Sequence, residues 1–188
     1  MMKRVSEWLR RVSTGWVALS ALVVFLLFSA LVLPRQSDTA EEVAQGAGSP
    51  DMSLYYSADD LYQMAEAYGE QGRKAYVRAR FTFDLVWPLV YTLFLATAIS
   101  WLFSKAFAPE SGWQRANLAP VLGALFDYLE NLATSLVMAR YPNPTAVVDV
   151  LAPVFTLLKW AFLAGSFALL IAGMVIAAWR WIKERGKE

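Results

Sequence analysis

Four apolar stretches, separated by polar segments, dominate the pattern of hydrophobic positions along the chain. Each has about the 20 residues that a helix, rising 1.5 Å per residue, needs to cross the hydrocarbon core of a bilayer. They run over Trp16–Leu33, Phe81–Phe103, Leu118–Met138 and Val150–Trp179 (residues 16–33, 81–103, 118–138 and 150–179). The pattern therefore predicts an all-α integral membrane protein, with four transmembrane helices in a single domain over residues 1–188.

The longest polar segment, residues 34–80, separates the first two apolar stretches. Pro34–Ser53 is acidic and rich in Gly, Ala and Ser, which is typical of an irregular linker. Ser57 and Asp60 then have the spacing of a capping box, and an apolar stripe follows as far as Gly69. We expect an interfacial helix over about residues 58–69, which turns at the glycines and continues into the second span.

Tyrosines are concentrated in this polar segment, since five of the eight lie between Tyr55 and Tyr76. Tyrosine is enriched at the headgroup level of membranes, where one end of its ring is wet and the other is apolar. The segment is either a lid over a site between the spans or a plain interfacial connector. The connector is the simpler interpretation.

Lys and Arg in the flanks of the spans predict the orientation, because cytoplasmic flanks carry the excess of these residues. The N-terminal tail holds four basic residues, and four more lie in the C-terminal tail, Arg180–Glu188. We therefore expect an integral membrane protein, in the cell membrane if prokaryotic, with both termini cytoplasmic and residues 34–80 extracytoplasmic.

Composition excludes several classes of function. Of the 188 residues, 57% are hydrophobic and 14% aromatic, and the net charge of +1 gives no basic field for binding nucleic acid. The chain has no cysteine and no histidine, which excludes disulfides, thiolate nucleophiles and His-ligated zinc or haem. We expect neither a metal nor another cofactor.

The third span carries polar groups near its middle: Asp127, Glu130 and Asn131. At 100° per residue they project from one side of the helix, opposite a leucine-rich side. A carboxylate at bilayer depth costs about 2.5–3.5 kcal/mol or more unless it faces protein or water and finds a partner. This face should therefore meet polar groups from neighbouring helices.

The other spans offer such partners at similar depth. Lys159 of the fourth span is expected to pair mainly with Asp127, and Arg80 with Asp84 at i,i+4. A single polar pocket in the outer half of the bilayer satisfies these placements. Its candidate residues are Asp84, Tyr91, Asp127, Glu130, Asn131, Lys159 and Arg80. Three basic residues near the outer surface, Arg73, Lys74 and Arg78, are candidates for holding a phosphate headgroup.

These residues favour binding or processing of a lipid-like amphiphile, and membrane lipids are the expected partners. An ion- or proton-translocating protein is an alternative, with the carboxylates as relay groups, and a structural role for the charged pairs is another. Catalytic residues cannot be assigned, so the sequence does not decide whether the protein is an enzyme. An aspartyl-protease dyad and a Mg²⁺ site are both disfavoured, the first by unequal depths and the second by the nearby Lys159.

A strip of small residues follows one side of the fourth span and includes Ala164, Ala168 and Ala172. Small residues let two helices approach closely in a membrane. The strip is expected to pack against another span of the same chain. The alternative is contact with a second copy or with another subunit of a larger membrane complex, in which the chain would be an accessory subunit.

Overall fold

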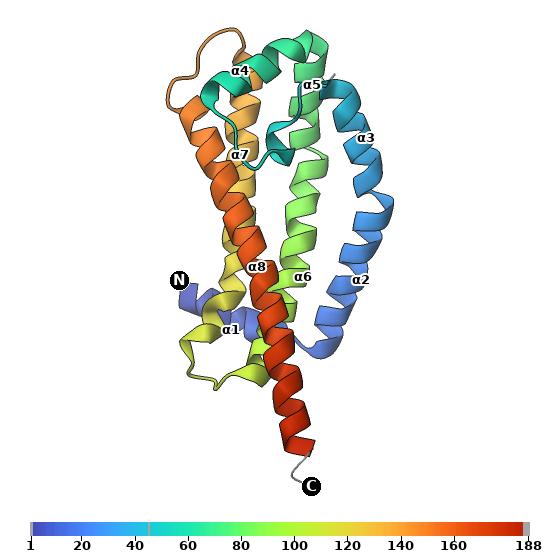
Figure 1. The fold of residues 1–188 in the computed structure, drawn as a ribbon, viewed down its shortest axis with the longest axis vertical. Helices are drawn as coiled ribbons and strands as arrows, with labels where there is room; N and C mark the ends of the chain where they lie inside the picture. The colour runs from blue at the N-terminus through green and yellow to red at the C-terminus, as the bar shows by residue number, and fades with distance from the viewer. Residues whose placement is uncertain (1, 45, 186–188) are drawn as a thin grey trace. The chain divides into compact units, whose positions relative to one another are not determined.

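The computed structural model describes residues 2–44 and 46–185, and every regular element in them is helical (Figure 1). The basic C-terminal tail extends three residues past the described part. The helices, in chain order, are α1 (Met2–Val12), α2 (Gly15–Leu31), α3 (Leu33–Ala44), η1 (Pro50–Met52), α4 (Ala58–Ala67), α5 (Gly69–Arg80), α6 (Phe83–Ala106), η2 (Gly112–Leu118), α7 (Ala119–Arg140) and α8 (Val148–Arg185). The all-α prediction is confirmed.

Three helical stretches are long and apolar enough to cross a membrane: Gly69–Ala106, Gly112–Arg140 and Val148–Arg185. The predicted first span corresponds to α2, which has only 17 residues. It reaches spanning length when joined to α1, from which it is bent by 94°. The structure therefore supports three long apolar helices, and a fourth where the bent pair is one span.

The prediction of an irregular linker over Pro34–Ser53 is wrong for its first part, which is helix α3. Pro34 stands in the first helical turn, where its missing N–H is not needed, and good helix formers follow. The end of α3 packs against α5, with Ala44 buried and the Val43 carbonyl close to Gly72. Tertiary packing of these residues outweighs the acidic, polar composition.

The capping box at α4 is confirmed. The Ser57 hydroxyl accepts a hydrogen bond from the Asp60 N–H at 3.2 Å, and the Asp60 carboxylate accepts one from the Ser57 N–H at 2.8 Å. The helix begins at Ala58 as expected and ends at Ala67. Gly69, at φ 60°, occupies the left-handed region where the chain turns into α5.

The chain divides into two compact units, and helices α2, α6, α7 and α8 contribute residues to both. Unit 1 comprises residues 1–26, 90–122 and 162–188, and unit 2 comprises 27–89 and 123–161. The core of unit 2 contains Tyr56, Tyr68 and Tyr76, each at most 4% exposed. These tyrosines therefore form a packed core, which differs from the expected interfacial role.

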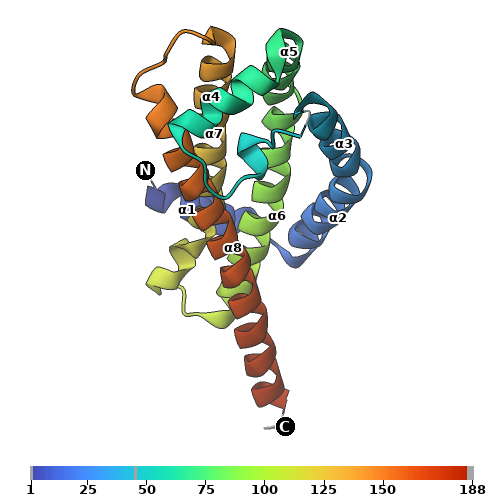
Figure 2. The same ribbon diagram turned by 45° about the horizontal axis from the view of Figure 1, so that its top comes forward.

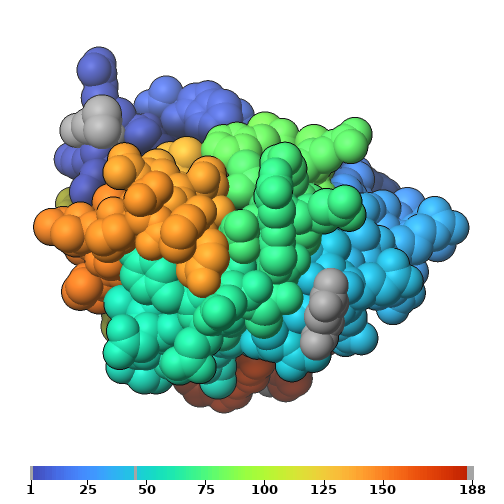
Figure 3. Space-filling view, turned by 90° about the horizontal axis from the view of Figure 1, so that it is seen from above, coloured from blue at the N-terminus to red at the C-terminus, as the bar shows by residue number. Residues whose placement is uncertain are grey.

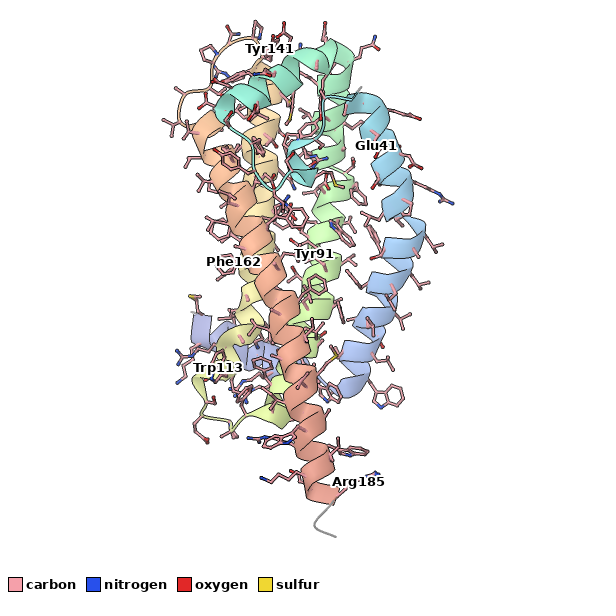
Figure 4. The ribbon with its side chains drawn as sticks, in the orientation of Figure 1. Glu41, Tyr91, Trp113, Tyr141, Phe162 and Arg185 are labelled. Atoms are coloured by element: carbon pink, nitrogen blue, oxygen red, sulfur yellow. The ribbon has the colours of Figure 1, made fainter. Side chains whose placement is uncertain are left out.

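Within unit 2, α4 lies across the ends of α7 and α8 next to the loop between them (Figures 1 and 3). Tyr62 of α4 donates to Asp149 Oδ2 at 3.0 Å and accepts from the Thr145 N–H at 2.8 Å. The Arg73 guanidinium of α5 lies 4.6 Å from the ring centroid of Tyr141, which Figure 4 labels. These contacts fasten the 58–80 segment to the α7–α8 loop.

Unit 1 is organised by the polar residues of η2. Gln114 Nε2 lies within 3.2 Å of three carbonyls, those of Phe103, Phe107 and Ala108, and so caps the end of α6. Asn117 Nδ2 donates to the Ser6 carbonyl at 3.1 Å, and the Ser6 hydroxyl donates to the Gln114 carbonyl at 3.2 Å. Helix α1, which the sequence did not predict, is thereby docked on η2.

The small-residue strip of α8 contains one closely packed glycine and several exposed alanines. Gly173 packs closely on Phe103 of α6, where an added Cβ would lie 2.9 Å from a ring carbon. Ala164, Ala168 and Ala172 are exposed instead. The expectation that these alanines pack against another helix of the chain is wrong.

Candidate functional site

A buried ion pair joins α7 and α8 in unit 2. Lys159 Nζ lies 2.5 Å from Glu130 Oε2, and the two side chains are 6% and 0% exposed. The prediction that Asp127 is the main partner of Lys159 is wrong. Asp127 and Glu130 lie on the same face of α7, and the register of α8 places the ammonium group one turn further along, at Glu130.

Hydroxyl groups complete the surroundings of Glu130. Thr156 Oγ1 lies 2.7 Å from Glu130 Oε1 and 3.0 Å from the Tyr56 hydroxyl oxygen. A hydroxyl has only one proton, so Thr156 donates to the carboxylate and accepts from Tyr56. Burial raises the pKa of Tyr56 well above its ordinary value, and the charge of Glu130 raises it further. Tyr56 is therefore a neutral donor at physiological pH.

A second ionic group is built on Arg80 at the end of α5. Its guanidinium pairs with Asp51, and its Nε lies 3.0 Å from Asp84 Oδ2, which confirms the predicted Arg80–Asp84 pair. The guanidinium also lies 4.5 Å from the ring centroid of Tyr76. The Tyr76 hydroxyl oxygen in turn lies 3.3 Å from Asp51 Oδ1. Asp51 thus connects α5 to the segment before α4.

That segment, residues 49–57, is called the strap below, and Figure 2 shows it between α3 and α4. Apart from the short η1 it has no regular structure, and side chains of α8 hold it by its backbone. Lys159 Nζ donates to the Asp51 carbonyl at 3.4 Å, and Trp160 Nε1 donates to the Ser53 carbonyl at 3.1 Å. The strap therefore covers the ionic groups and takes part in them.

The outward side of the strap is apolar. Met52, Leu54 and Tyr55 are 73%, 68% and 68% exposed, whereas Pro50 and Tyr56 are buried. A large apolar side chain left in water is unfavourable by about 1.5–3 kcal/mol relative to burial. Met52, Leu54 and Tyr55 therefore form an apolar surface on the outward side of the strap.

Asp127 and Asn131 lie beside the two ion pairs. The Asn131 amide donates to Asp127 Oδ1 at 3.3 Å, and both side chains are buried. Asp127 interacts electrostatically with Lys159 and with Asp84. With these two residues, unit 2 brings together six of the seven predicted pocket residues. The seventh, Tyr91, belongs to unit 1, where it is buried.

We call this set the ionic network: Asp51, Arg80, Asp84, Asp127, Glu130 and Lys159. It contains four carboxyl groups and two basic groups, so with every group ionised its net charge is −2. Ionised groups are costly to bury without compensation. Protons, water or a cation can compensate the two extra carboxyl groups. No group of three or more carboxylates in the described part of the chain is placed to hold a metal ion.

The three candidates for holding a phosphate headgroup, Arg73, Lys74 and Arg78, do not form a common site. Arg73 Nη1 donates to the Ala65 carbonyl at 2.7 Å, and so ties α5 to α4. Lys74 forms an exposed ion pair with Glu70 at 2.6 Å, and Arg78 is exposed on α5. Each side chain therefore has its own surroundings. The fourth basic residue of the segment, Arg80, is buried in the ionic network.

Sequence reasoning missed Asp51, Tyr56 and Tyr76. Asp51 lies in the stretch taken for a linker, where its neighbours are Gly, Ser and Pro and no periodicity marks it. Composition alone predicts a membrane-interface position for the two tyrosines. The sequence does contain one indication of further partners. The predicted pocket has three acids and two bases, and a buried set with an excess of acids requires additional partners.

Comparison with known proteins adds no family to this description. No protein-family model, no curated protein and no solved structure matches the chain.

Proposed function

We propose that the chain is a multi-pass membrane protein that binds a lipid-like amphiphile at the ionic network, through a positively charged headgroup. The single observation that carries this proposal is the acid excess of the network, four carboxyls against two cations, in an enclosed setting. An ammonium headgroup supplies the missing charge and donates hydrogen bonds to carboxylates. The same excess disfavours the phosphate headgroup expected from Arg73, Lys74 and Arg78.

Membrane insertion is supported by the three long apolar helices and by the exposed apolar surface of α8. Counting α2 as a fourth span, with the helix α1 bent away from it at its start, places both termini on the cytoplasmic side, as the basic flanks predict. The network then lies toward the extracytoplasmic side. The exposed side of the strap, with Met52, Leu54 and Tyr55, then faces the lipid, from which an amphiphile would arrive.

Access to the network requires the strap to move, because its backbone and Asp51 occupy the position beside Lys159 and Arg80. The strap is held by the Arg80–Asp51 ion pair and by the hydrogen bonds that Lys159 and Trp160 donate to its carbonyls. An ammonium headgroup has donors only, so it would pair with the carboxyl groups that remain in the network, Asp84, Asp127 and Glu130. Of the polar segment 34–80, we therefore propose that only the strap, residues 49–57, acts as a lid.

The test is a binding titration of the purified protein with hexadecylamine and with hexadecanol, which has the same chain length and no charge. The change in tryptophan fluorescence is the signal, since Trp160 contacts the strap. We expect the amine to bind and the alcohol to bind at least tenfold more weakly. Asp127→Asn should weaken amine binding, and Glu70→Gln, which removes an exposed carboxylate of α5, should leave it unchanged. Equal binding of amine and alcohol would overturn the proposal.

The acid excess also supports a second candidate, a proton-carrying function in which protons rather than a ligand balance the carboxyls. The titration distinguishes the two candidates. A proton carrier gives no amine binding and releases protons when the pH is raised, in a quantity that Asp127→Asn reduces.

A role as subunit of a larger membrane complex is favoured by a different observation. Over an apolar stretch of 18 residues, α8 is only 17% buried, whereas the corresponding stretches within residues 69–106 and 112–140 are 61% and 56% buried. Its exposed face carries Ile171, Met174 and Val175 next to the alanine strip. A partner helix would be detected as a complex larger than the monomer in mild detergent.

A further inference from the structure

A groove lies at the junction of α1, η2, α7 and α8 within unit 1, and its volume is about 350 Å³. Its floor is apolar, formed by Leu118, Leu122 and Phe162 together with two alanines. Figure 4 labels Phe162 on α8. Two basic side chains, Lys3 of α1 and Arg115 of η2, line the same groove and are exposed. An apolar floor with two cations is the arrangement that an anionic amphiphile requires.

We infer that this groove binds an anionic phospholipid of the cytoplasmic leaflet, with the phosphate between Lys3 and Arg115 and the start of one acyl chain along Leu122 and Phe162. The inference rests on the proposed membrane insertion and concerns a site separate from the ionic network. Basic residues near the surface of the cytoplasmic leaflet attract anionic lipids. Arg115 in addition offers a planar pair of donors that matches phosphate.

The surroundings of the groove support a lipid rather than a soluble ligand. Helix α1 is strongly amphipathic, with Met2, Val5, Leu9 and Val12 on one side and the charged residues on the other. Trp8 is 60% and Trp16 80% exposed, as expected for side chains at headgroup level. An amphipathic basic helix bent by 94° from the following apolar helix is suited to lie along the membrane surface.

The groove is also held open by the polar contacts of η2. Ser6 of α1 is fixed to Gln114 and Asn117, and Arg10 Nη1 donates to the Pro109 carbonyl at 3.2 Å. These bonds set α1 at a fixed place beside η2, so Lys3 and Arg115 stay on the groove. Glu7 is the one acidic residue of α1; it does not line the groove, but it is the i+4 neighbour of Lys3 on the charged side of the helix.

The test is native mass spectrometry of the detergent-purified full chain with phosphatidylglycerol or phosphatidylcholine of identical acyl chains. We expect one phosphatidylglycerol to bind with preference. The double variant Lys3→Gln/Arg115→Gln should lower its affinity about tenfold and abolish the preference, since each basic residue near a membrane contributes a fewfold. The matched control, Arg4→Gln/Arg11→Gln, removes the same charge from exposed positions outside the groove and should bind like the parent.

Three outcomes would overturn the inference: equal binding of the two lipids by the parent, equal losses in both double variants, or displacement of the lipid by inorganic phosphate at millimolar concentration. A further variant, Ala119→Phe, fills the floor and should reduce binding of both lipids. Hexadecylamine binding is measured on the same samples. Loss of the phospholipid site with amine binding intact separates this inference from the proposed function.

Discussion

Lys159 of α8 and Glu130 of α7 form an ion pair with 2.5 Å between Nζ and Oε2, and both side chains are almost fully buried. Desolvating two charges costs several kcal/mol each, and only close geometry with further hydrogen bonds recovers that cost. Removing one partner leaves the other buried and uncompensated. The pair is therefore sensitive to single substitutions and tolerant of a matched double one.

Lys159→Met and Glu130→Gln should each destabilise the protein by about 3–5 kcal/mol, and the double variant should recover much of that loss. Thermal unfolding in detergent measures this. Lys159→Met/Asp127→Asn is the control for the choice of partner, and it should recover less than the double variant with Glu130→Gln. Equal recovery in the two doubles would show that Lys159 does not depend on Glu130 in particular.

Asp51→Asn should loosen the strap, because it removes the charge that Arg80 binds. We expect residues 49–57 to exchange amide hydrogens faster, while α7 and α8 stay protected. Asp59→Asn, which changes an exposed acid in the first turn of α4, is the matched control. If the two variants exchange alike, the Arg80–Asp51 pair does not hold the strap.

The capping box of α4 makes the start of this helix sensitive to acid. The Ser57 N–H and hydroxyl donate to the Asp60 carboxylate at 2.8 and 2.7 Å and lower its pKa, the backbone bond most. A lowered folded-state pKa means that the stabilisation is present above the ordinary pKa and is lost as the pH falls through the folded-state value. In the parent, the hydrogen-exchange protection factors of the first-turn amides should decrease when the pH is lowered below about 4. They should be independent of pH in Asp60→Asn.

Gly173→Ala should destabilise unit 1, since its Cβ would lie 2.9 Å from a ring carbon of Phe103. Overpacking of this kind costs about 1–3 kcal/mol. Gly165→Ala is the matched control on the same helix, where an added Cβ has no neighbour within 4 Å. It should be neutral or stabilising by up to about 1 kcal/mol, because alanine is the better helix former. A similar melting temperature for the two variants would contradict close packing of α6 and α8 at Gly173.

The sequence predicted the parts of the fold that hydrophobic length and local chemistry determine. The long helices, the capping box with Asp60 and the i,i+4 pair of Arg80 and Asp84 are all of this kind. Helix α3 was missed because its stability depends on packing against α5, which local composition does not reveal. Helix α1 was likewise missed, although its apolar and charged residues alternate with helical periodicity.

The site was predicted less completely, for a geometric reason. Asp127 and Glu130 are three residues apart on one face, a rise of about 4.5 Å, so a small axial shift of α8 decides which of them meets Lys159. Hydrophobic periodicity predicts which face of a helix a residue lies on, but not its axial position relative to the neighbouring helix. Asp51 reaches the network from an irregular segment, and the position of such a segment follows from tertiary contacts alone.

The central claim, that the strap closes an acid-rich site for a cationic headgroup, is tested most directly by locking the strap. The chain has no native cysteine, so Ser53→Cys/Trp160→Cys can be joined across the strap–α8 contact by a bis-methanethiosulfonate reagent and released by reductant. Hexadecylamine binding, measured by native mass spectrometry, should be lost when the link is formed and return on reduction. Undiminished amine binding in the linked protein would contradict the account.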